Sequence, residues 1–183
     1  MYLEQKFISK IVKIDELKAF IPQIVNLLKN QGFRLIRVKK LKGERDTMQF
    51  MVEKIDLTAL TVEDCAELSR SISPILDIKN SIKNNYLLEI SSPGIERPLI
   101  EPLDFERYKG NIIKLKANNS KNEIIKIVGL LTKFDGKHLE IVDSNTGKEL
   151  SFSFNNVLDA HLVFKSETLS EKSKIEGARR VKC

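Results

Sequence analysis

The stretch at residues 91–99, "SSPGIERPL", combines two prolines and a glycine directly after an apolar run, "YLLEI" at residues 86–90. Pro93 and Gly94 suit the two central positions of a type II turn, in which the second position needs a positive φ. Pro98 fixes another backbone angle and disfavours helix at the residue before it. We therefore expect a stiff corner here, with a separate folded unit on each side.

The residues before the corner predict a small α+β domain. Hydrophobic residues recur at helical spacing in two segments, and the segments between them have the composition of strands. The expected elements are a helix over 15–30, strands over 33–41 and 48–56, a helix that begins at 61, and a strand over 85–91. This α-β-β-α-β order predicts a three-stranded sheet with two helices on one face. Met48, Phe50 and Val52 should share a face of the second strand, whereas the first strand has no clear alternation.

Two prolines and one threonine refine the expected helices. Pro22 belongs in a first turn, so regular helix should begin near Ile21. Thr61 can cap the second helix by accepting a hydrogen bond from a backbone N–H. Pro74 should end or kink that helix near Ser71. The expected buried stripe of the second helix is Val62, Cys65, Ala66, Ser69, Ile72 and Leu76.

The residues after the corner predict a small all-β domain. Five short segments alternate apolar and polar residues, at 111–117, 123–134, 137–143, 148–154 and 157–164. Five short strands favour a small, partly closed barrel of the SH3-like or OB type. Phe134, Phe152 and Phe154 alternate with polar neighbours, so we expect them in its core rather than stacked on bases. The predicted division is an α/β domain at 1–92, a linker at 93–98, a β-barrel domain at 99–164 and a basic, disordered tail at 165–183.

Composition narrows the classes of function. The 183 residues carry a net charge of +6, which favours an anionic partner, nucleic acid before membrane, although a modest excess also aids solubility. No apolar run is long enough to span a bilayer and no signal peptide pattern begins the chain, so a cytoplasmic location is expected. Two distant cysteines and two isolated histidines predict neither a disulfide nor a metal site.

An enzymatic function is not favoured. Cys65 follows Asp64 near the start of a predicted helix, where a thiolate could be stabilised as a nucleophile. It falls, however, on the expected buried stripe, and the first domain holds no histidine that could act as its base. Glycine loops of the kind that hold nucleotide phosphates are also missing. We expect no catalytic residues and no cofactor.

Two strings carry a resemblance to a known family. "TVEDCAELSRSISPILD" at 61–77 and "YLLEISSPGIERPL" at 86–99 resemble the ribosome maturation factor P (RimP) family. Glu96 stands where the family usually has Asp, which keeps the charge. The hairpin "NNSKNEIIK" at 118–126 lacks the family's basic and glycine character, which puts in doubt how much RNA the barrel itself touches.

The resemblance implies an α/β domain joined to a C-terminal SH3-like barrel. It also implies a non-enzymatic bacterial assembly factor, monomeric and cytoplasmic, that binds the immature small ribosomal subunit. The family contacts rRNA and, through its C-terminal domain, a ribosomal protein near the decoding centre. The alternative is an autonomous RNA-binding module of the Sm or cold-shock type that acts off the ribosome. Aromatic residues make up only 7% of the chain and tryptophan is absent, which speaks against that alternative.

Two sets of residues are candidates for binding and for joining the domains. Residues that could meet rRNA phosphates are Arg34, Arg37, Lys39, Lys40, Lys42, Arg45, Arg179, Arg180 and Lys182. The motif residues expected at the joint are Ser91, Ser92, Pro93, Gly94, Glu96, Arg97 and Pro98. The guanidinium of Arg97 should be held by a carboxylate or carbonyl acceptor, and the preferred candidate is a carboxylate of the barrel, which would lock the two domains at a fixed angle. Otherwise Arg97 lies on the ribosome-facing surface.

Overall fold

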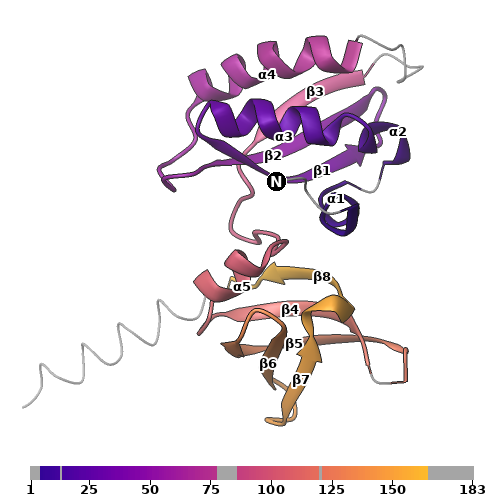
Figure 1. Cartoon of the computed structure of the whole chain (residues 1–183), viewed down its shortest axis with the longest axis vertical. Coiled ribbons are helices and arrows are strands. Elements are labelled where there is room, and N and C mark those ends of the chain that lie inside the picture. The colour runs from indigo at the N-terminus through magenta and orange to yellow at the C-terminus, as the bar shows by residue number, and fades with distance from the viewer. Residues whose placement is uncertain (1–4, 13, 78–85, 120, 165–183) are drawn as a thin grey trace, which may run out of the picture.

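The protein contains two β-sheets, each with its own hydrophobic core. The structure, a computed structural model, describes residues 5–12, 14–77, 86–119 and 121–164. The two sheets lie one after the other along the longest axis of the molecule (Figure 1). No helix in these ranges is long and apolar enough to cross a membrane. The expected α+β character is confirmed.

The first sheet has the strand order β1-β2-β3, and α3 and α4 cover one of its faces (Figure 1). Its elements are α1 (Gln5–Ile11), α2 (Asp15–Lys18), α3 (Ile21–Asn30), β1 (Phe33–Leu41), β2 (Asp46–Lys54), α4 (Val62–Asp77) and β3 (Tyr86–Ser91). β1 and β2 are antiparallel, whereas β3 pairs parallel with β2 after the α4 crossover. α1 was not predicted, and the helix expected over 15–30 is divided into α2 and α3. Pro22 lies in the first turn of α3, as the sequence predicted.

β1 contains a β-bulge that decides which way its arginines point. The register with β2 shifts between Leu35 and Arg37, so that Ile36 is the extra residue. Without the bulge, Arg34 and Arg37 would point to opposite faces, because side chains alternate along a strand. With it, both lie on the face turned away from α3 and α4. The bulge is the physical reason why the alternation of this strand could not be assigned from the sequence.

β2 has the alternation that the sequence predicted. Met48, Phe50 and Val52 are fully buried against the helices. The opposite face carries Gln49, which donates to Glu89 of β3, and it also carries Glu53. One face of β2 therefore builds the core, and the other presents polar groups away from it.

α4 extends further than one form of the prediction allowed. The sequence predicted that Pro74 would end or kink the helix near Ser71, and it does not end it, because the helix runs on to Asp77. Proline removes one backbone donor from the helix, but Ile75 and Leu76 just after it are buried in the first core, and their burial stabilises the last turn. The N-terminus is as expected: the backbone N–H of Asp64 donates to the Thr61 hydroxyl at 3.1 Å.

The expected buried stripe of α4 is only partly correct. The buried residues of the helix are Leu68, Ile72, Ile75 and Leu76. Val62 is 80% exposed and Ala66 is exposed, because the first turns of the helix project past the edge of the core. Cys65 is partly exposed.

The second sheet has the strand order β7-β6-β5-β4-β8, all antiparallel. Its elements are α5 (Pro102–Arg107), β4 (Ile112–Asn118), β5 (Ile124–Phe134), β6 (His138–Asp143), β7 (Glu149–Ser153), the 3-10 turn η1 (Phe154–Asn156) and β8 (Val157–Leu162). Each strand lies within two residues of its predicted range. Among the described residues β7 and β8 do not pair, so hydrogen bonds do not close this sheet into a barrel. α5 was not predicted.

Aromatic side chains form the centre of the second core. Phe105 of α5 lies with its ring centroid 5.6 Å from that of Phe134 and 5.4 Å from that of Phe154. Phe152 is 7% exposed and belongs to the same cluster. The three phenylalanines of the strand segments are therefore core residues, as predicted, and α5 covers them.

Candidate functional site

The segment between the two sheets is where the sequence predicted a corner. Gly94 has the positive φ that was expected of it, 70°, but the turn in this segment lies at Ile95 and Glu96 rather than at Pro93 and Gly94. The segment then joins the second sheet through β8: the backbone N–H of Leu99 donates to Ala160, and that of Leu162 donates to Arg97, each at 2.9 Å. Pro98 forms an isolated antiparallel bridge with His161. The end of the motif is thus part of the second unit.

Arg97 is the central side chain of the joint. It is only 4% exposed, although its guanidinium is charged. Its Nε and Nη2 donate to the two carboxylate oxygens of Glu53, at 2.8 and 2.9 Å. Nη2 also donates to Asp104 at 2.8 Å, and Nη1 donates to the carbonyl of Pro98 at 2.8 Å. One guanidinium therefore connects β2 of the first sheet to α5 of the second unit.

Asp104 is the fully buried acid of this cluster. Its Oδ2 accepts the backbone N–H groups of Ile100 and Glu101, at 2.8 and 2.9 Å, within the capping box of α5. Its Oδ1 accepts from Arg97 and from Arg34. A buried carboxylate is stable only when its oxygens are paired in this way.

Arg34 completes the cluster from β1. Its guanidinium donates to Glu53 at 2.7 Å, to Asp104 and to Glu101 at 3.3 Å. Arg107 of α5 lies 3.7 Å from Glu53. We call the six side chains the joint cluster: Arg34, Arg97, Arg107, Glu53, Glu101 and Asp104. Three cations balance three anions, so the cluster is neutral overall.

Two opposing effects set the pKa values of the carboxyl groups in the joint cluster: burial raises them, and the neighbouring arginines lower them. Burial alone would raise the pKa of Asp104, but the charges of Arg97 and Arg34 outweigh it and hold this pKa below its ordinary value. Burial also acts to raise the pKa of Glu53, and its bonds to the same two arginines lower it on balance. Both carboxylates are therefore ionised at neutral pH, which keeps the ion pairs intact.

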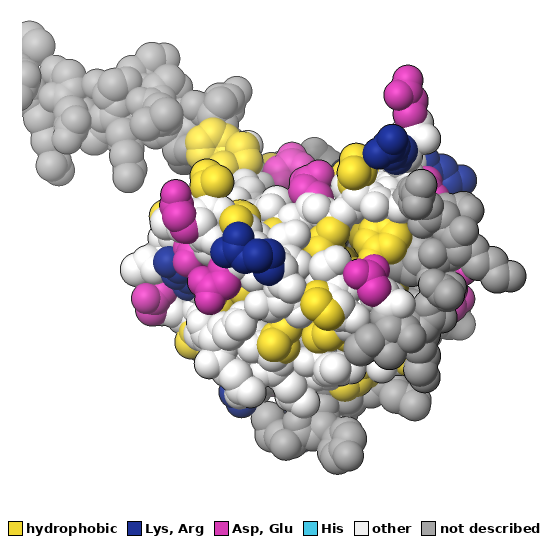
Figure 2. Space-filling view, turned by 90° about the horizontal axis from the view of Figure 1, so that it is seen from above, with side chains coloured by type: hydrophobic (Ala, Val, Ile, Leu, Met, Phe, Trp, Pro, Cys, Tyr) yellow, Lys and Arg dark blue, Asp and Glu magenta, His cyan; other side chains and the backbone are white. Residues whose placement is uncertain are grey.

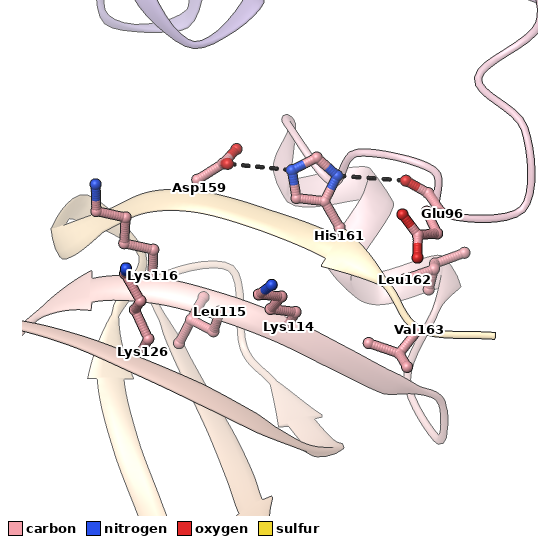
Figure 3. Close-up of a pocket in the computed structure, with 9 residues that line it drawn as sticks. All are labelled: Glu96, Lys114, Leu115, Lys116, Lys126, Asp159, His161, Leu162 and Val163. Atoms are coloured by element: carbon pink, nitrogen blue, oxygen red, sulfur yellow. Dashed lines mark hydrogen bonds and ion pairs between the residues drawn. The ribbon is translucent and has the colours of Figure 1, made fainter. Parts of the chain in front are cut away.

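A second contact links the sheets through Arg37. It is 6% exposed, and its Nη2 donates to Asp159 of β8 at 2.6 Å. Burial would raise the pKa of Asp159, but a bond to His161 and the charge of Arg37 lower it well below its ordinary value. His161 Nδ1 lies 3.3 Å from the carbonyl oxygen of Glu96, and its Nε2 lies 3.1 Å from Oδ2 of Asp159 (Figure 3). Asp159 and His161 thus connect β1, the corner and β8.

The basic residues proposed from the sequence fall into three groups: some form ion pairs, some are left as surface candidates, and some lie outside the described residues. Arg34 and Arg37 lie in ion pairs between the two units. Lys40 pairs with Asp46 at 2.6 Å. Lys39 is half-buried, and Lys42 and Arg45 are exposed in or before the β1–β2 turn. Arg179, Arg180 and Lys182 lie outside the described residues.

On its described part, the outer face of the first unit does not concentrate cationic side chains. Figure 2 views the molecule from above Figure 1, onto the end where α3 and α4 lie. On the part of this face that is described, Lys and Arg side chains are scattered among acidic and hydrophobic ones. The described part of this face therefore offers no concentrated positive charge to a polyanion.

Sequence reasoning missed the acids that hold the arginines. Asp104 had a usable signal, because Glu101 and Asp104 have the spacing of a capping box and proline stands between them. Glu53 had a weaker one, as an acid on the polar face of an otherwise apolar strand. Asp159 and His161 had none, since their partner lies more than a hundred positions earlier in the chain.

The structure offers little for catalysis at Cys65. Burial and the neighbouring Asp64 raise the pKa of its thiol, so the thiolate is disfavoured at neutral pH. Within the described ranges no three His, Cys, Asp or Glu side chains are grouped so as to hold a metal ion. The charged side chains that do cluster, those of the joint cluster, are paired with one another.

Comparison with known families agrees with the architecture of the first unit. A family model described as the RimP N-terminal domain matches residues 23–96. The first unit is a RimP N-terminal domain. The match covers α3 from Gln23 onward, then β1, β2, α4, β3 and the corner up to Glu96. The resemblance to the RimP family, the ribosome maturation factors, is confirmed by this match, which contains the string at 61–77 and most of the string at 86–99.

Proposed function

We propose that this protein is a non-enzymatic maturation factor that binds the immature small ribosomal subunit in the cytoplasm. The observation that carries the proposal is the RimP N-terminal domain over residues 23–96. The net charge of +6 suits a partner rich in phosphate. The disfavoured thiolate of Cys65 supports a binding role over a catalytic one.

In this proposal the chain consists of an α/β domain at 1–92, a linker at 93–98, an SH3-like domain at 99–164 and a basic tail at 165–183. The two separate cores support the division. The strand order supports the SH3-like assignment, because four strands follow one another as neighbours and β8 returns to pair with the first of them, β4. The second domain would contact a ribosomal protein near the decoding centre, as the family resemblance implies.

The joint would hold the two domains at one angle, so that both meet the subunit together. Arg97 and Arg34 bind acids of both units, and Arg37 binds Asp159 across the same boundary. A fixed angle lowers the entropy lost on binding, since the partner does not have to order two independent bodies. The motif residues of the corner would serve this purpose.

Contacts with rRNA would come from cations that the joint does not use. Of the residues proposed from the sequence, Lys39, Lys42 and Arg45 of the first unit remain candidates. Lys40 is a weaker candidate, because Asp46 already pairs with it. Arg179, Arg180 and Lys182 of the tail remain candidates on sequence grounds. Arg34 and Arg37 are left out of this surface.

Sedimentation of a cell extract tests the proposal. We expect the protein to travel as a monomer and with free small subunits, and not with complete ribosomes. The matched comparison is an extract depleted of immature subunits, in which the bound fraction should fall. A protein that binds protein-free RNA as tightly as it binds the subunit, and never sediments with particles, would instead be an autonomous RNA-binding module.

A further inference from the structure

Three lysines share one face of the second sheet. Lys114 and Lys116 of β4 and Lys126 of β5 are exposed, whereas Ile113 and Leu115, which alternate with the two lysines of β4, are buried in the core. Lys116 stands directly opposite Lys126 in the strand register. In Figure 3 the three side chains rise from the same side of the sheet. We call Lys114, Lys116 and Lys126 the lysine face.

The lysine face borders a shallow pocket of about 360 Å³. On its far side lie Glu96, Asp159 and His161, the last two opposite Lys116 and Lys114 in the register (Figure 3). The carboxylate of Asp159 is already bound to Arg37 and His161. None of the three lysines forms an ion pair with a described residue, so their charges are not neutralised within this part of the molecule.

One pair in this arrangement is unfavourable for the protein alone, and Asp159, which is opposite Lys116 on β8, offsets it only in part because Arg37 and His161 already bind that carboxylate. Like charges directly opposite each other on neighbouring strands destabilise a sheet, and Lys116 and Lys126 are such a pair. An anionic ligand would remove this repulsion. Besides the charged groups, the pocket is lined by His161, Leu115, Leu162 and Val163, and by no Phe, Tyr or Trp. The one ring available for stacking, His161, is held between Glu96 and Asp159, whereas phosphate oxygens have three lysine donors.

We infer that the lysine face binds the phosphate backbone of an RNA. This inference rests on the proposed function, which makes rRNA a ligand, and it names the surface that binds it. Lys114 and Lys116 are two residues apart on a strand, which spaces them by about 6.6 Å and suits successive phosphates. An acidic peptide added as an extra strand does not fit, because β4 and β5 are interior strands whose backbone groups are already paired on both sides.

The test uses the full chain and a fluorescent RNA hairpin of arbitrary sequence, titrated at several salt concentrations. The variant is the triple substitution Lys114→Gln, Lys116→Gln and Lys126→Gln. We expect its affinity to fall at least about tenfold and its salt slope to drop by about two to three units, because each lysine on a phosphate contributes about one unit. The matched control removes three exposed lysines elsewhere on the same unit, Lys109, Lys137 and Lys148, and should keep both values.

A variant with one substitution keeps the inference testable if the triple variant does not fold. Lys126→Gln should bind the hairpin more weakly, while its melting temperature stays equal or rises, because the repulsion from Lys116 is removed. An affinity and salt slope like those of the unmodified protein in the triple variant, or an equal loss in the control, would overturn the inference. So would retained RNA binding together with lost binding to isolated ribosomal proteins.

The hairpin assay contains no ribosomal particles, so its outcome is separable from the proposed function. A protein that never sediments with small subunits contradicts the proposed function alone. Hairpin binding that does not depend on the three lysines contradicts the lysine face alone.

Discussion

Arg97 and Glu53 form a two-point ion pair across the joint, with Nε 2.8 Å from Oε2 and Nη2 2.9 Å from Oε1. The parallel geometry of a guanidinium and a carboxylate makes this a strong class of hydrogen bond. Because Arg97 is 4% exposed, the loss of either partner leaves the other charge buried and unpaired. The pair therefore affects both stability and the relation between the two units.

Arg97→Ala should lower the free energy of unfolding by about 3 kcal/mol, the usual cost of breaking a buried ion pair. Arg97→Lys should lose less, since it keeps the charge but cannot bind both carboxylate oxygens in a plane. Urea denaturation followed by circular dichroism measures both. Lys133→Ala, which breaks the exposed ion pair with Glu140, is the matched control and should change little. A loss in Arg97→Ala no larger than in this control would contradict the buried role.

The angle between the two units should depend on Arg37 as well as Arg97. Arg37→Ala removes the contact with Asp159, and Arg97→Ala removes the contacts with Glu53 and Asp104. We expect each variant to keep both sheets and to give a longer, looser particle in small-angle scattering than the unmodified protein. The opposite result is that the variants scatter like the unmodified protein and yet bind the subunit more weakly. That result would contradict a fixed angle held by these arginines and would place Arg97 in the ribosome contact.

Stability should fall in acid. The pKa values of Glu53, Asp104 and Asp159 are all lowered in the folded protein, so the unfolded chain takes up protons first as the pH drops. The stabilisation is complete above the unfolded values of about 4 and is lost progressively below them. Thermal melting between about pH 7 and pH 3 should show a plateau followed by a decline. Asp104→Asn should be less stable at neutral pH and show a shallower decline; a decline as steep as that of the unmodified protein would exclude Asp104 as a cause.

Gly94→Ala should cost about 1 kcal/mol of stability. Gly94 has a φ of 70°, which L-residues with a Cβ atom adopt at a cost of about 1–2 kcal/mol. No atom lies within 4 Å of the position of an added Cβ, so the cost is conformational strain rather than a clash. Gly94→Asn should lose less, because asparagine tolerates this conformation better. Gly43→Ala, at a glycine with ordinary φ, is the control, and an equal loss there would contradict the explanation.

Cys65 should react slowly and be dispensable. Burial and the charge of Asp64 raise the pKa of its thiol, so alkylation by iodoacetamide near pH 7.5 should be slower than that of free cysteine. The measurement is made in a Cys183→Ser background, so that only one thiol reports. Cys65→Ala should leave subunit binding unchanged. Lost function in a stably folded Cys65→Ala protein would reopen the catalytic hypothesis.

The regular elements of this protein could be predicted because their hydrophobic pattern is local. β2 alternates cleanly, the Thr61 cap stands directly before α4, and each strand of the second sheet is bounded by turn residues. α5 escaped prediction because six residues with only two buried side chains give too short a pattern. β1 could not be assigned to faces because the bulge at Ile36 breaks the alternation on which such an assignment depends.

The sequence predicted the corner and the role of Arg97 at the joint, but not the acids that bind Arg97. Prolines and a glycine around Arg97 indicated a stiff corner and a held guanidinium. Its partners Glu53 and Asp104 lie 44 positions before it and seven after it, and only the folded sheets bring them together. The same limit explains Arg34 and Arg37, which resemble a cationic strand in the sequence and are paired with acids in the structure. Charge counted along a chain does not show which charges remain free.

Leu99 and Ile100 are neighbours in the chain, yet they are buried in different cores: Leu99 in that of the second sheet and Ile100 in that of the first. The two cores therefore meet at the peptide bond between Leu99 and Ile100, and no linker residue separates them there. During synthesis the first core stays incomplete until the chain has emerged past Ile100, and Glu53 has no buried arginine from the corner until Arg97 has emerged. A fragment that ends at residue 92 would lack both, so the RimP N-terminal domain should be prepared as a fragment that extends through α5.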